Sequence, residues 1–244
     1  MFSAGDFLNI KALWATFKFA VFTVLLILCA LLLHGLSHEI DVRTAAACPA
    51  PTVVIDPGHG GEDGGAVGIN GCIEKELNLD IALILRDLLT ASGVKVKMTR
   101  TEDIMLYDAD TPGKKKLQDL KKRVEIGEEN EESLTVSIHM NTYPSPKYSG
   151  AQVYYSPNHP DSKALAERVQ GHIREYLQPA NTRQIKESTS AIYLLHNIKN
   201  PAVLIECGFI SNQAEAELLC RDDYRHKVAL TIYSALIDHL NKEV

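Results

Sequence analysis

Two histidines and a glutamate stand directly after short apolar runs that are typical of buried strands. His59 comes after the first of these runs, His139 after the third and Glu206 after the last. Because ligands bind beyond the carboxyl ends of parallel strands, we expect these side chains to converge. Two imidazoles and a carboxylate are a ligand set that catalytic zinc accepts while one position stays open for water. Hydrolysis would need a further carboxylate to take the water proton. The pattern leaves open which glutamate binds metal and which transfers protons.

The elements that must position these residues alternate between strands and helices. Strands are expected at residues 52–56, 94–98, 134–138, 152–155, 192–195 and 202–205. Helices are expected at residues 75–92, 114–130, 165–177 and 224–240. This alternation predicts a single α/β domain with a mostly parallel twisted sheet flanked by helices, since parallel strands need crossover connections.

The segment 114–130 is the most polar of the expected helices. Leu117, Leu120, Val124 and Ile126 recur on one side of it and are its expected inner positions. The pattern predicts a surface helix that packs against the rest of the domain through this narrow apolar stripe.

The N-terminal segment differs in character from the rest of the chain. Its apolar run is at the lower edge of the length that spans a bilayer, roughly 17 to 25 residues. Lys11 and Lys18 favour an N-terminus inside the cell, which places the bulk of the protein outside the cytoplasm. The segment either anchors the protein in the membrane, which the spacing favours, or is cleaved to release it. The expected organisation is a short cytoplasmic N-terminus (1–16), a signal anchor or signal peptide (17–36), a linker (37–50) and a catalytic domain (51–244).

Composition narrows the classes of partner and the redox chemistry. The formal net charge is −6 and no basic stripe is present, which argues against a nucleic-acid partner. Five cysteines form no CxxC pair and no dense framework, so buried free thiols are the prediction. A single Cys72–Cys207 disulfide is the alternative.

Four motifs occur in one order along the chain. They are Asp-Pro-Gly-His-Gly-Gly at 56–61, Glu-Lys at 74–75, Ser-Ile-His-Met-Asn at 137–141 and Glu-Cys-Gly-Phe-Ile-Ser-Asn at 206–212. Together they resemble the signature of the zinc-dependent N-acetylmuramoyl-L-alanine amidases of the amidase-3 type. The resemblance covers the chain from about Val53 to its end. It implies hydrolysis, by zinc-activated water, of the amide bond between N-acetylmuramic acid and L-alanine in peptidoglycan.

The same resemblance implies a role for each site residue. His59, Glu74 and His139 match the ligands of one Zn²⁺ per chain, and Glu206 matches the catalytic glutamate. Asn141 matches a position that binds the substrate peptide. Burial at the end of a strand would raise the pKa of Glu206 and suit it to proton transfer.

The Cys-Gly-Phe ending, the lone apolar segment and the lack of wall-binding repeats most resemble the germination-specific amidases. Those enzymes act on spore cortex and prepare muramic δ-lactam. Three alternatives stay open: a vegetative cell-wall autolysin, a zinc peptidase that cuts within the stem peptide, and a catalytically silent binding or regulatory relative. Besides peptidoglycan, a protein partner that shapes or loads the site is expected, because zinc binding is coupled to folding of its ligands.

Overall fold

The computed structural model describes residues 14, 17–31, 52–107 and 114–241, and the chain divides into two units, Met1–Pro49 and Ala50–Val244. In the first unit, residues 17–31 are helical and their apolar side chains are exposed. No helix in the described part of the chain is long and apolar enough to cross a membrane. The predicted linker at 37–50, and nearly all of the predicted cytoplasmic N-terminus, lie outside the described residues.

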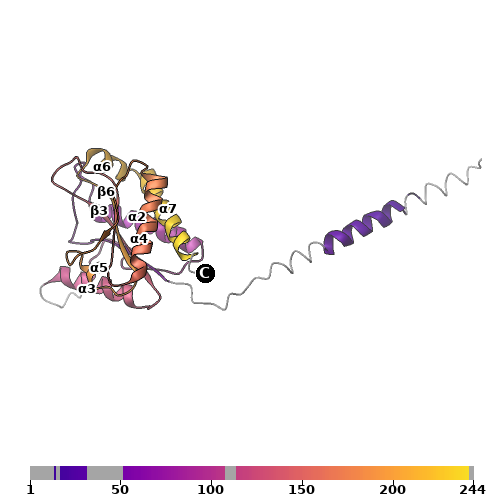
Figure 1. Cartoon of the computed structure of the whole chain (residues 1–244), viewed down its shortest axis with the longest axis horizontal. Coiled ribbons are helices and arrows are strands. Elements are labelled where there is room, and N and C mark those ends of the chain that lie inside the picture. Colours follow the sequence, from indigo (N-terminus) through magenta and orange to yellow (C-terminus); the bar gives the residue numbers. More distant parts are fainter. Residues whose placement is uncertain (1–13, 15–16, 32–51, 108–113, 242–244) are drawn as a thin grey trace, which may run out of the picture. The chain divides into compact units, whose positions relative to one another are not determined.

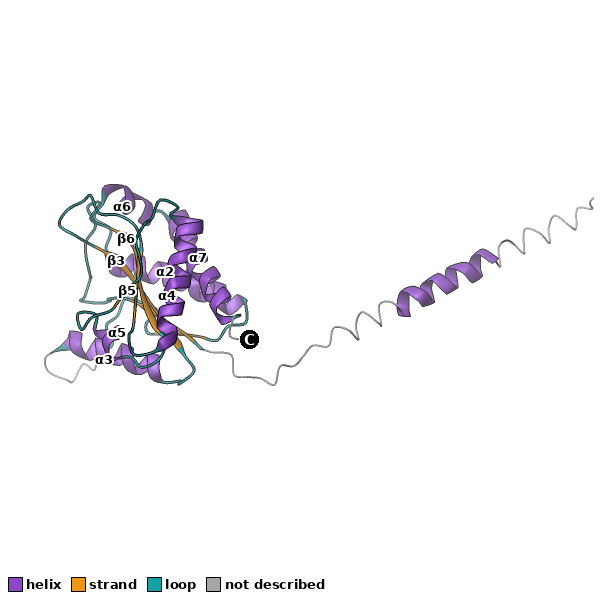
Figure 2. Cartoon of the chain, viewed as in Figure 1, coloured by secondary structure: helices purple, strands orange, loops and turns teal. Residues whose placement is uncertain are grey.

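A six-stranded sheet organises the second unit (Figure 2). Its strands are β1 (Val53–Pro57), β2 (Val96–Met98), β3 (Leu134–Asn141), β4 (Gln152–Tyr155), β5 (Lys186–Glu187) and β6 (Ala202–Phe209). They are ordered β2-β1-β3-β6-β4-β5. Strands β2, β1, β3 and β6 are parallel to one another, β4 is antiparallel to β6, and β5 is parallel to β4. The prediction of a single α/β domain with a mostly parallel sheet is confirmed.

Helices cover both faces of this sheet (Figure 1). One face carries α2 (Glu74–Ala91), α4 (Pro160–His172) and α7 (Asp222–Leu240), and the other carries α3 (Lys115–Glu128) and α5 (Tyr193–Asn197). The π-helical turn η1 (Ile173–Leu177) continues α4, and α6 (Gln213–Leu219) follows β6. Alternate residues of β6 enter the two cores, Val203 and Ile205 the larger one under α2, α4 and α7, and Ala202 and Leu204 the smaller one. Both faces of the central strands are therefore buried, as a parallel sheet requires.

The strand predicted at residues 192–195 is wrong. This segment enters the short helix α5, whose Leu194 and Leu195 are buried together with Ile198 in the smaller core. A four-residue apolar run fits a buried strand or a buried helical turn equally well, so the pattern could not separate them. The sheet instead gains β5, a two-residue exposed edge strand of polar residues.

The predicted apolar stripe is not the buried face of α3. Asp119, Arg123 and Gly127 are the buried residues of this helix, whereas Leu117 and Leu120 are only half-buried. The three buried positions follow at intervals of four residues and therefore share one side of the helix. That side is polar because the sheet face beneath it is polar, as the contacts of the candidate site show.

Cys72 and Cys220 form a disulfide with their Cα atoms 6.4 Å apart. The predicted free thiols are therefore wrong for these two cysteines, and so is the alternative Cys72–Cys207 link. Cys207 is a buried free thiol, as expected. The disulfide partners are 148 residues apart. Only the fold brings the loop before α2 to the turn between α6 and α7, so cysteine spacing carried no signal for this pair.

Candidate metal centre

The loop between β1 and α2 folds His59 back towards Glu74, the first residue of α2. His59 has a φ of 63°, in the left-handed region. Gly58 lies against the ring of His139, where an added Cβ would overlap the imidazole. Gly65 has a φ of 69°, and a Cβ there would lie 2.6 Å from Glu74 Oε2. Glycine at these two positions lets the loop approach both side chains closely.

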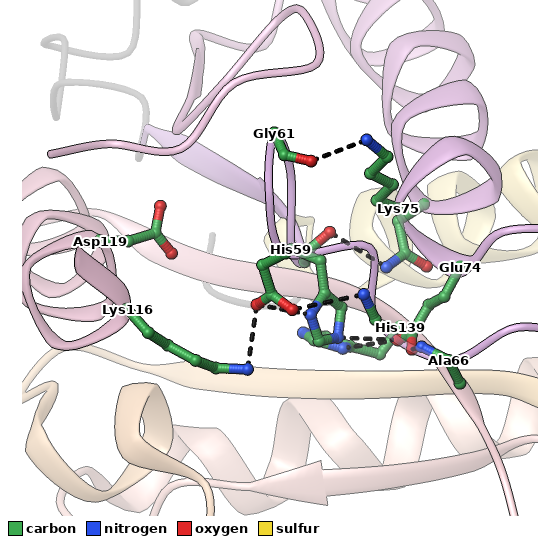
Figure 3. Close-up of polar contacts among 12 residues, drawn as sticks. His59, Gly61, Ala66, Glu74, Lys75, Lys116, Asp119 and His139 are labelled. Carbon is green, nitrogen blue, oxygen red and sulfur yellow. Dashed lines mark hydrogen bonds and ion pairs between the residues drawn. The ribbon is translucent and has the colours of Figure 1, made fainter. Parts of the chain in front are cut away.

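His59, Glu74 and His139 converge at the carboxyl ends of β1 and β3 (Figure 3). Glu74 Oε1 lies 3.2 Å from His59 Nε2 and 3.0 Å from His139 Nδ1. One ligand atom from each of the three residues lies within 4.8 Å of the other two. The structure thus brings together three of the residues singled out in the sequence, although they come from a loop, a helix and a strand.

Asp63 and Lys116 orient His59 from behind, and sequence analysis missed both. Asp63 Oδ2 lies 2.9 Å from His59 Nδ1 and 3.0 Å from the Lys116 ammonium, which reaches in from α3 (Figure 3). A proton on Nδ1, donated to Asp63, leaves the Nε2 lone pair directed at the cluster. Such carboxylate–histidine pairs are the usual support of a metal-binding imidazole. The only sequence signal was an acidic residue four positions after His59 in the same loop.

Glu74 is held in its ionised form. Its Oε2 accepts a hydrogen bond from the backbone N–H of Ala66 at 2.8 Å, and its Oε1 accepts one from Met140 at 3.1 Å. Burial alone would raise the pKa of Glu74, but the hydrogen bonds and charges of His139 and His59 outweigh it and place this pKa far below its usual range. In turn, burial would lower the pKa of His59, but Glu74 and then Asp63 raise it.

Glu206 lies on the neighbouring strand, beside the cluster. It pairs with His139 in the parallel register of β3 and β6, so both side chains project from the same face of the sheet. Glu206 is partly exposed as a residue, but its Oε2 is buried and has no hydrogen-bond partner among the described residues. Burial raises the pKa of Glu206 to about 7, with Glu74 adding to the rise and His139 and His59 opposing it. The raised pKa predicted for a carboxylate at this position is confirmed.

A buried ionic network from α3 supports the backbone of the His59 loop. Arg123 donates from Nη1 to Asp56 Oδ1 at 2.6 Å, from Nη2 to the carbonyl of His59 at 2.7 Å and from Nε to Asp119 Oδ2 at 2.8 Å. Ser137 donates to the other oxygen of Asp56 at 2.6 Å. This network holds β1, β3 and α3 together directly beneath the cluster. Sequence analysis missed it, although Asp119 and Arg123 stand four residues apart on a helix.

Asn141 lies at the end of β3 but outside the cluster. Its backbone carbonyl accepts a hydrogen bond from Ile210 at 2.9 Å, and its side chain makes no hydrogen bond within the described residues. The pairing with β6 shifts register between His139 and Asn141. The amide of Asn141 is therefore half-buried and available to a ligand, which agrees with its predicted role without testing it.

Comparisons with known proteins place this geometry in a family. The model of the N-acetylmuramoyl-L-alanine amidase family matches residues 53–238. A germination-specific N-acetylmuramoyl-L-alanine amidase of Bacillus subtilis is 39% identical over 193 residues, which cover 78% of this chain and 80% of that protein.

Solved structures give the same result. The CwlD amidase of Clostridioides difficile, determined in complex with the GerS lipoprotein, is 38% identical and superimposes with a TM-score of 0.75, covering 79% of this chain and 99% of that one. The AmiC2 amidase of Nostoc punctiforme is 30% identical with a TM-score of 0.68, covering 79% of this chain and 98% of that one.

Proposed function

This chain belongs to the N-acetylmuramoyl-L-alanine amidase family, and we propose that it hydrolyses the amide bond between N-acetylmuramic acid and L-alanine with a zinc ion held by His59, Glu74 and His139. The observation that carries the proposal is the pairing of this three-residue cluster with Glu206 on the adjacent strand.

The residues present fit a catalytic zinc ion. Two imidazole nitrogens and one carboxylate oxygen within 4.8 Å of one another are a common catalytic zinc set. Asp63 contacts Nδ1 of His59 and so fixes the orientation of the imidazole. Glu206 Oε2 is a buried oxygen without a partner among the described residues. A zinc ion bound there supplies a Lewis acid and lowers the pKa of a water molecule.

Glu206 moves the proton. With a pKa of about 7, its carboxylate accepts a proton from the attacking water near neutral pH and then donates it to the amine of L-alanine as the amide bond breaks. Glu74 cannot take this role because its pKa is held far below neutrality and both its oxygens accept hydrogen bonds. The peptide-binding role of Asn141, beside the cluster on β3, completes the proposed assignment.

Product analysis tests the proposal. The zinc-loaded full-length protein would be incubated with purified peptidoglycan and the new ends identified by mass spectrometry. Stem peptides that begin with L-alanine, together with muramic acid lacking a peptide, are the expected products. Cuts inside the stem peptide would establish a zinc peptidase instead, and an absence of cleavage by zinc-loaded protein would favour a silent binding relative.

Spore cortex is the proposed substrate in the cell. The germination-specific relative in Bacillus subtilis and the CwlD structure support this choice. Deletion of the coding sequence should abolish muramic δ-lactam in purified cortex and impair germination while vegetative growth stays normal. A growth or cell-separation defect with normal cortex would point to a vegetative autolysin.

A lipoprotein is the proposed activating partner. The CwlD amidase was determined with the GerS lipoprotein, and this chain is 38% identical to CwlD over the 79% of its length that the comparison covers. Affinity capture of the full-length protein from sporulating cells, followed by zinc-binding measurements with and without the captured lipoprotein, would test whether the partner loads or shapes the site.

We further propose that the protein works outside the cytoplasm, attached to the membrane by residues 17–36 or released by cleavage. The exposed apolar side chains over residues 17–31 and the Cys72–Cys220 disulfide support this location, because disulfides persist in oxidising compartments. Protease added to intact protoplasts should digest the domain. Full protection of the domain would contradict the proposal.

A further inference from the structure

A row of side chains crosses three strands at the level of the candidate metal centre. His139 on β3 pairs with Glu206 on β6, and Glu206 pairs with Gln152 on β4. Directly opposed residues of neighbouring strands share a face, and the strands lie about 4.8 Å apart. Gln152 therefore projects from the same face as His139 and Glu206, with its Cα roughly 10 Å from that of His139.

Arg183 extends this row beyond Gln152. Its Nη1 donates to Gln152 Oε1 at 3.1 Å and its Nε donates to the carbonyl of Ser149 at 2.7 Å. The guanidinium carbon lies 4.5 Å from the centroid of the Phe209 ring, three residues after Glu206 on β6. Three of the five guanidinium N–H groups have no partner within the described residues. A half-buried cation thus lies beside Gln152, one strand beyond Glu206 in this row, and three of its N–H groups are available to a ligand.

No carboxylate of the described residues forms a hydrogen bond or an ion pair with Arg183, although the charge of Glu215 interacts with that of the guanidinium. Glu215, which is close to Phe209, accepts hydrogen bonds from the backbone amides of Gly150 at 2.9 Å and Phe209 at 2.8 Å. Arginine presents a planar fork of N–H donors that matches the two oxygens of a carboxylate. The missing partner therefore points to an anionic ligand group.

An exposed aromatic wall lies next to this arginine. Tyr148 is 39% exposed and its ring centroid is 6.5 Å from that of Phe209, while Tyr143 is 51% exposed and 4.7 Å from Tyr148. Both tyrosines belong to the segment that follows Asn141 at the end of β3. Exposed aromatic rings in contact with one another offer a flat apolar surface for a peptide or a sugar.

We propose that Arg183 selects the substrate by binding the free α-carboxylate of the second stem residue, D-glutamate, with Phe209 and Tyr148 flanking it. This inference rests on the proposed amidase function. If the scissile amide lies between His139 and Glu206, the second residue of an extended peptide ends about 7 Å further on. Arg183 contacts Gln152, the β4 residue that pairs with Glu206, so its guanidinium lies on the side of Glu206 away from His139.

Binding of two matched probes tests the proposal. Isothermal titration would use the zinc-loaded full-length Glu206→Gln protein, which should cleave its ligand far more slowly than the wild type does. The probes are N-acetylmuramoyl-L-alanyl-D-glutamate and N-acetylmuramoyl-L-alanyl-D-isoglutamine. Both carry the γ-carboxylate of the second residue, and they differ only in its α-group, which is a carboxylate in the first and a carboxamide in the second. We expect the acid to bind about 10- to 100-fold more tightly than the amide. Adding Arg183→Gln should remove this preference while leaving the affinity for the amide unchanged, and Arg183→Lys should retain part of it.

The control is Arg221→Gln, an exposed arginine paired with Asp223 on the surface, which should leave both affinities unchanged. If Arg183→Gln weakened the affinity for both probes equally, Arg183 would only position the backbone of Ser149, and the proposal would be overturned. A parent protein that binds acid and amide equally would also overturn it. If neither probe binds while the wild-type enzyme still releases peptides that begin with L-alanine from peptidoglycan, the proposed role of Arg183 is refuted and the proposed amidase function stands. If that release fails too, the proposed function fails with it.

Discussion

Glu74 and Glu206 are two carboxylates of one site whose surroundings drive their pKa values in opposite directions. Glu74 accepts hydrogen bonds from two backbone amides and contacts two histidines, so it stays ionised. Glu206 has a buried oxygen without a partner among the described residues, so its neutral form is favoured. Divergent pKa values in one site separate the role of ligand from that of acid and base.

Substitution of these residues should separate metal binding from turnover. Glu206→Gln should keep one zinc ion per chain but lower kcat about 10²- to 10⁴-fold, because only the proton acceptor is lost. His139→Ala should lose both zinc and turnover, since a ligand is lost. Metal analysis of purified protein and amide-cleavage assays check both statements. Normal turnover in the Glu206 variant would contradict its assignment as the proton-transfer group.

Glu206 should also cost stability in the metal-free protein. Its pKa in the folded state, about 7, lies above its ordinary value of 4.5. The folded state therefore binds this proton more tightly than the unfolded chain does, and the free energy of unfolding decreases as the pH rises from 4.5 through 7. At pH 8, Glu206→Gln should therefore stabilise the metal-free protein by up to about 3 kcal/mol, and at pH 4 by nearly nothing.

Urea unfolding in the presence of a chelator at the two pH values measures this difference. Glu131→Gln, at an exposed position, is the matched control and should change neither value. A Glu206→Gln protein that is less stable than wild type at pH 8 would show that burial of the ionised carboxylate does not destabilise the folded protein.

At the scale of elements, the contact between α3 and the sheet determines how the His59 loop is held. Arg123 joins β1 through Asp56 and the loop backbone through the His59 carbonyl, and Asp119 on the same helix completes the pairing. A buried ionic contact depends on the direction of its hydrogen bonds. It therefore allows α3 fewer positions on the sheet than a purely apolar contact would. Loss of one partner leaves an uncompensated buried charge.

Asp56→Asn should therefore destabilise the fold in a pH-dependent way. Burial alone would raise the pKa of Asp56, but the charge of Arg123 and the hydrogen bonds from Ser137 and Thr99 outweigh it and lower this pKa below 3.8. The stabilisation is thus complete above about pH 4 and is lost as the pH falls through the folded pKa. We expect a cost of about 3 to 5 kcal/mol at pH 7 and a smaller cost at pH 2.

Urea unfolding midpoints at both pH values check this expectation. Asp87→Asn removes an exposed aspartate paired with Arg86 and should have little effect at either pH. An equal cost for Asp56→Asn at pH 7 and pH 2 would mean that hydrogen-bond geometry, and not charge, explains the loss.

At the scale of the whole domain, the Cys72–Cys220 disulfide closes most of the chain into one loop. It links the segment just before α2 to the turn that precedes α7, and α2 begins with Glu74. Cross-links over long loops restrict the unfolded chain most, so a contribution of about 2 to 5 kcal/mol is expected.

Reduction should lower the melting temperature accordingly. Thermal unfolding of the zinc-loaded protein with and without dithiothreitol, and of Cys72→Ser, should show a decrease of similar size in both cases. Cys29→Ser changes an exposed cysteine outside this domain and should leave the melting temperature of the domain unaltered. A melting temperature insensitive to reduction would contradict a structural role for this bond.

Much of this molecule could be predicted from local pattern. The buried strands, the long helices and the α/β class follow from the period of apolar residues over about ten positions, which is a property of neighbouring residues. The motif residues lie towards the carboxyl ends of strands or at the start of a helix, where side chains of a parallel sheet meet. His59 follows β1, His139 and Glu206 lie in the second halves of β3 and β6, and Glu74 begins α2. The family resemblance rested on the same residues.

Only the tertiary structure decided the contacts between segments far apart in sequence. The Asp63–Lys116 support of His59, the Arg123 network, the Cys72–Cys220 bond and the row that ends at Arg183 join residues 30 to 150 positions apart. Such contacts have no period, because each depends on how whole elements pack. For the same reason the segment of α5 was predicted to be a strand. Its apolar run was visible, but the core that it enters also contains Val124 and Tyr154, which are far away in the sequence.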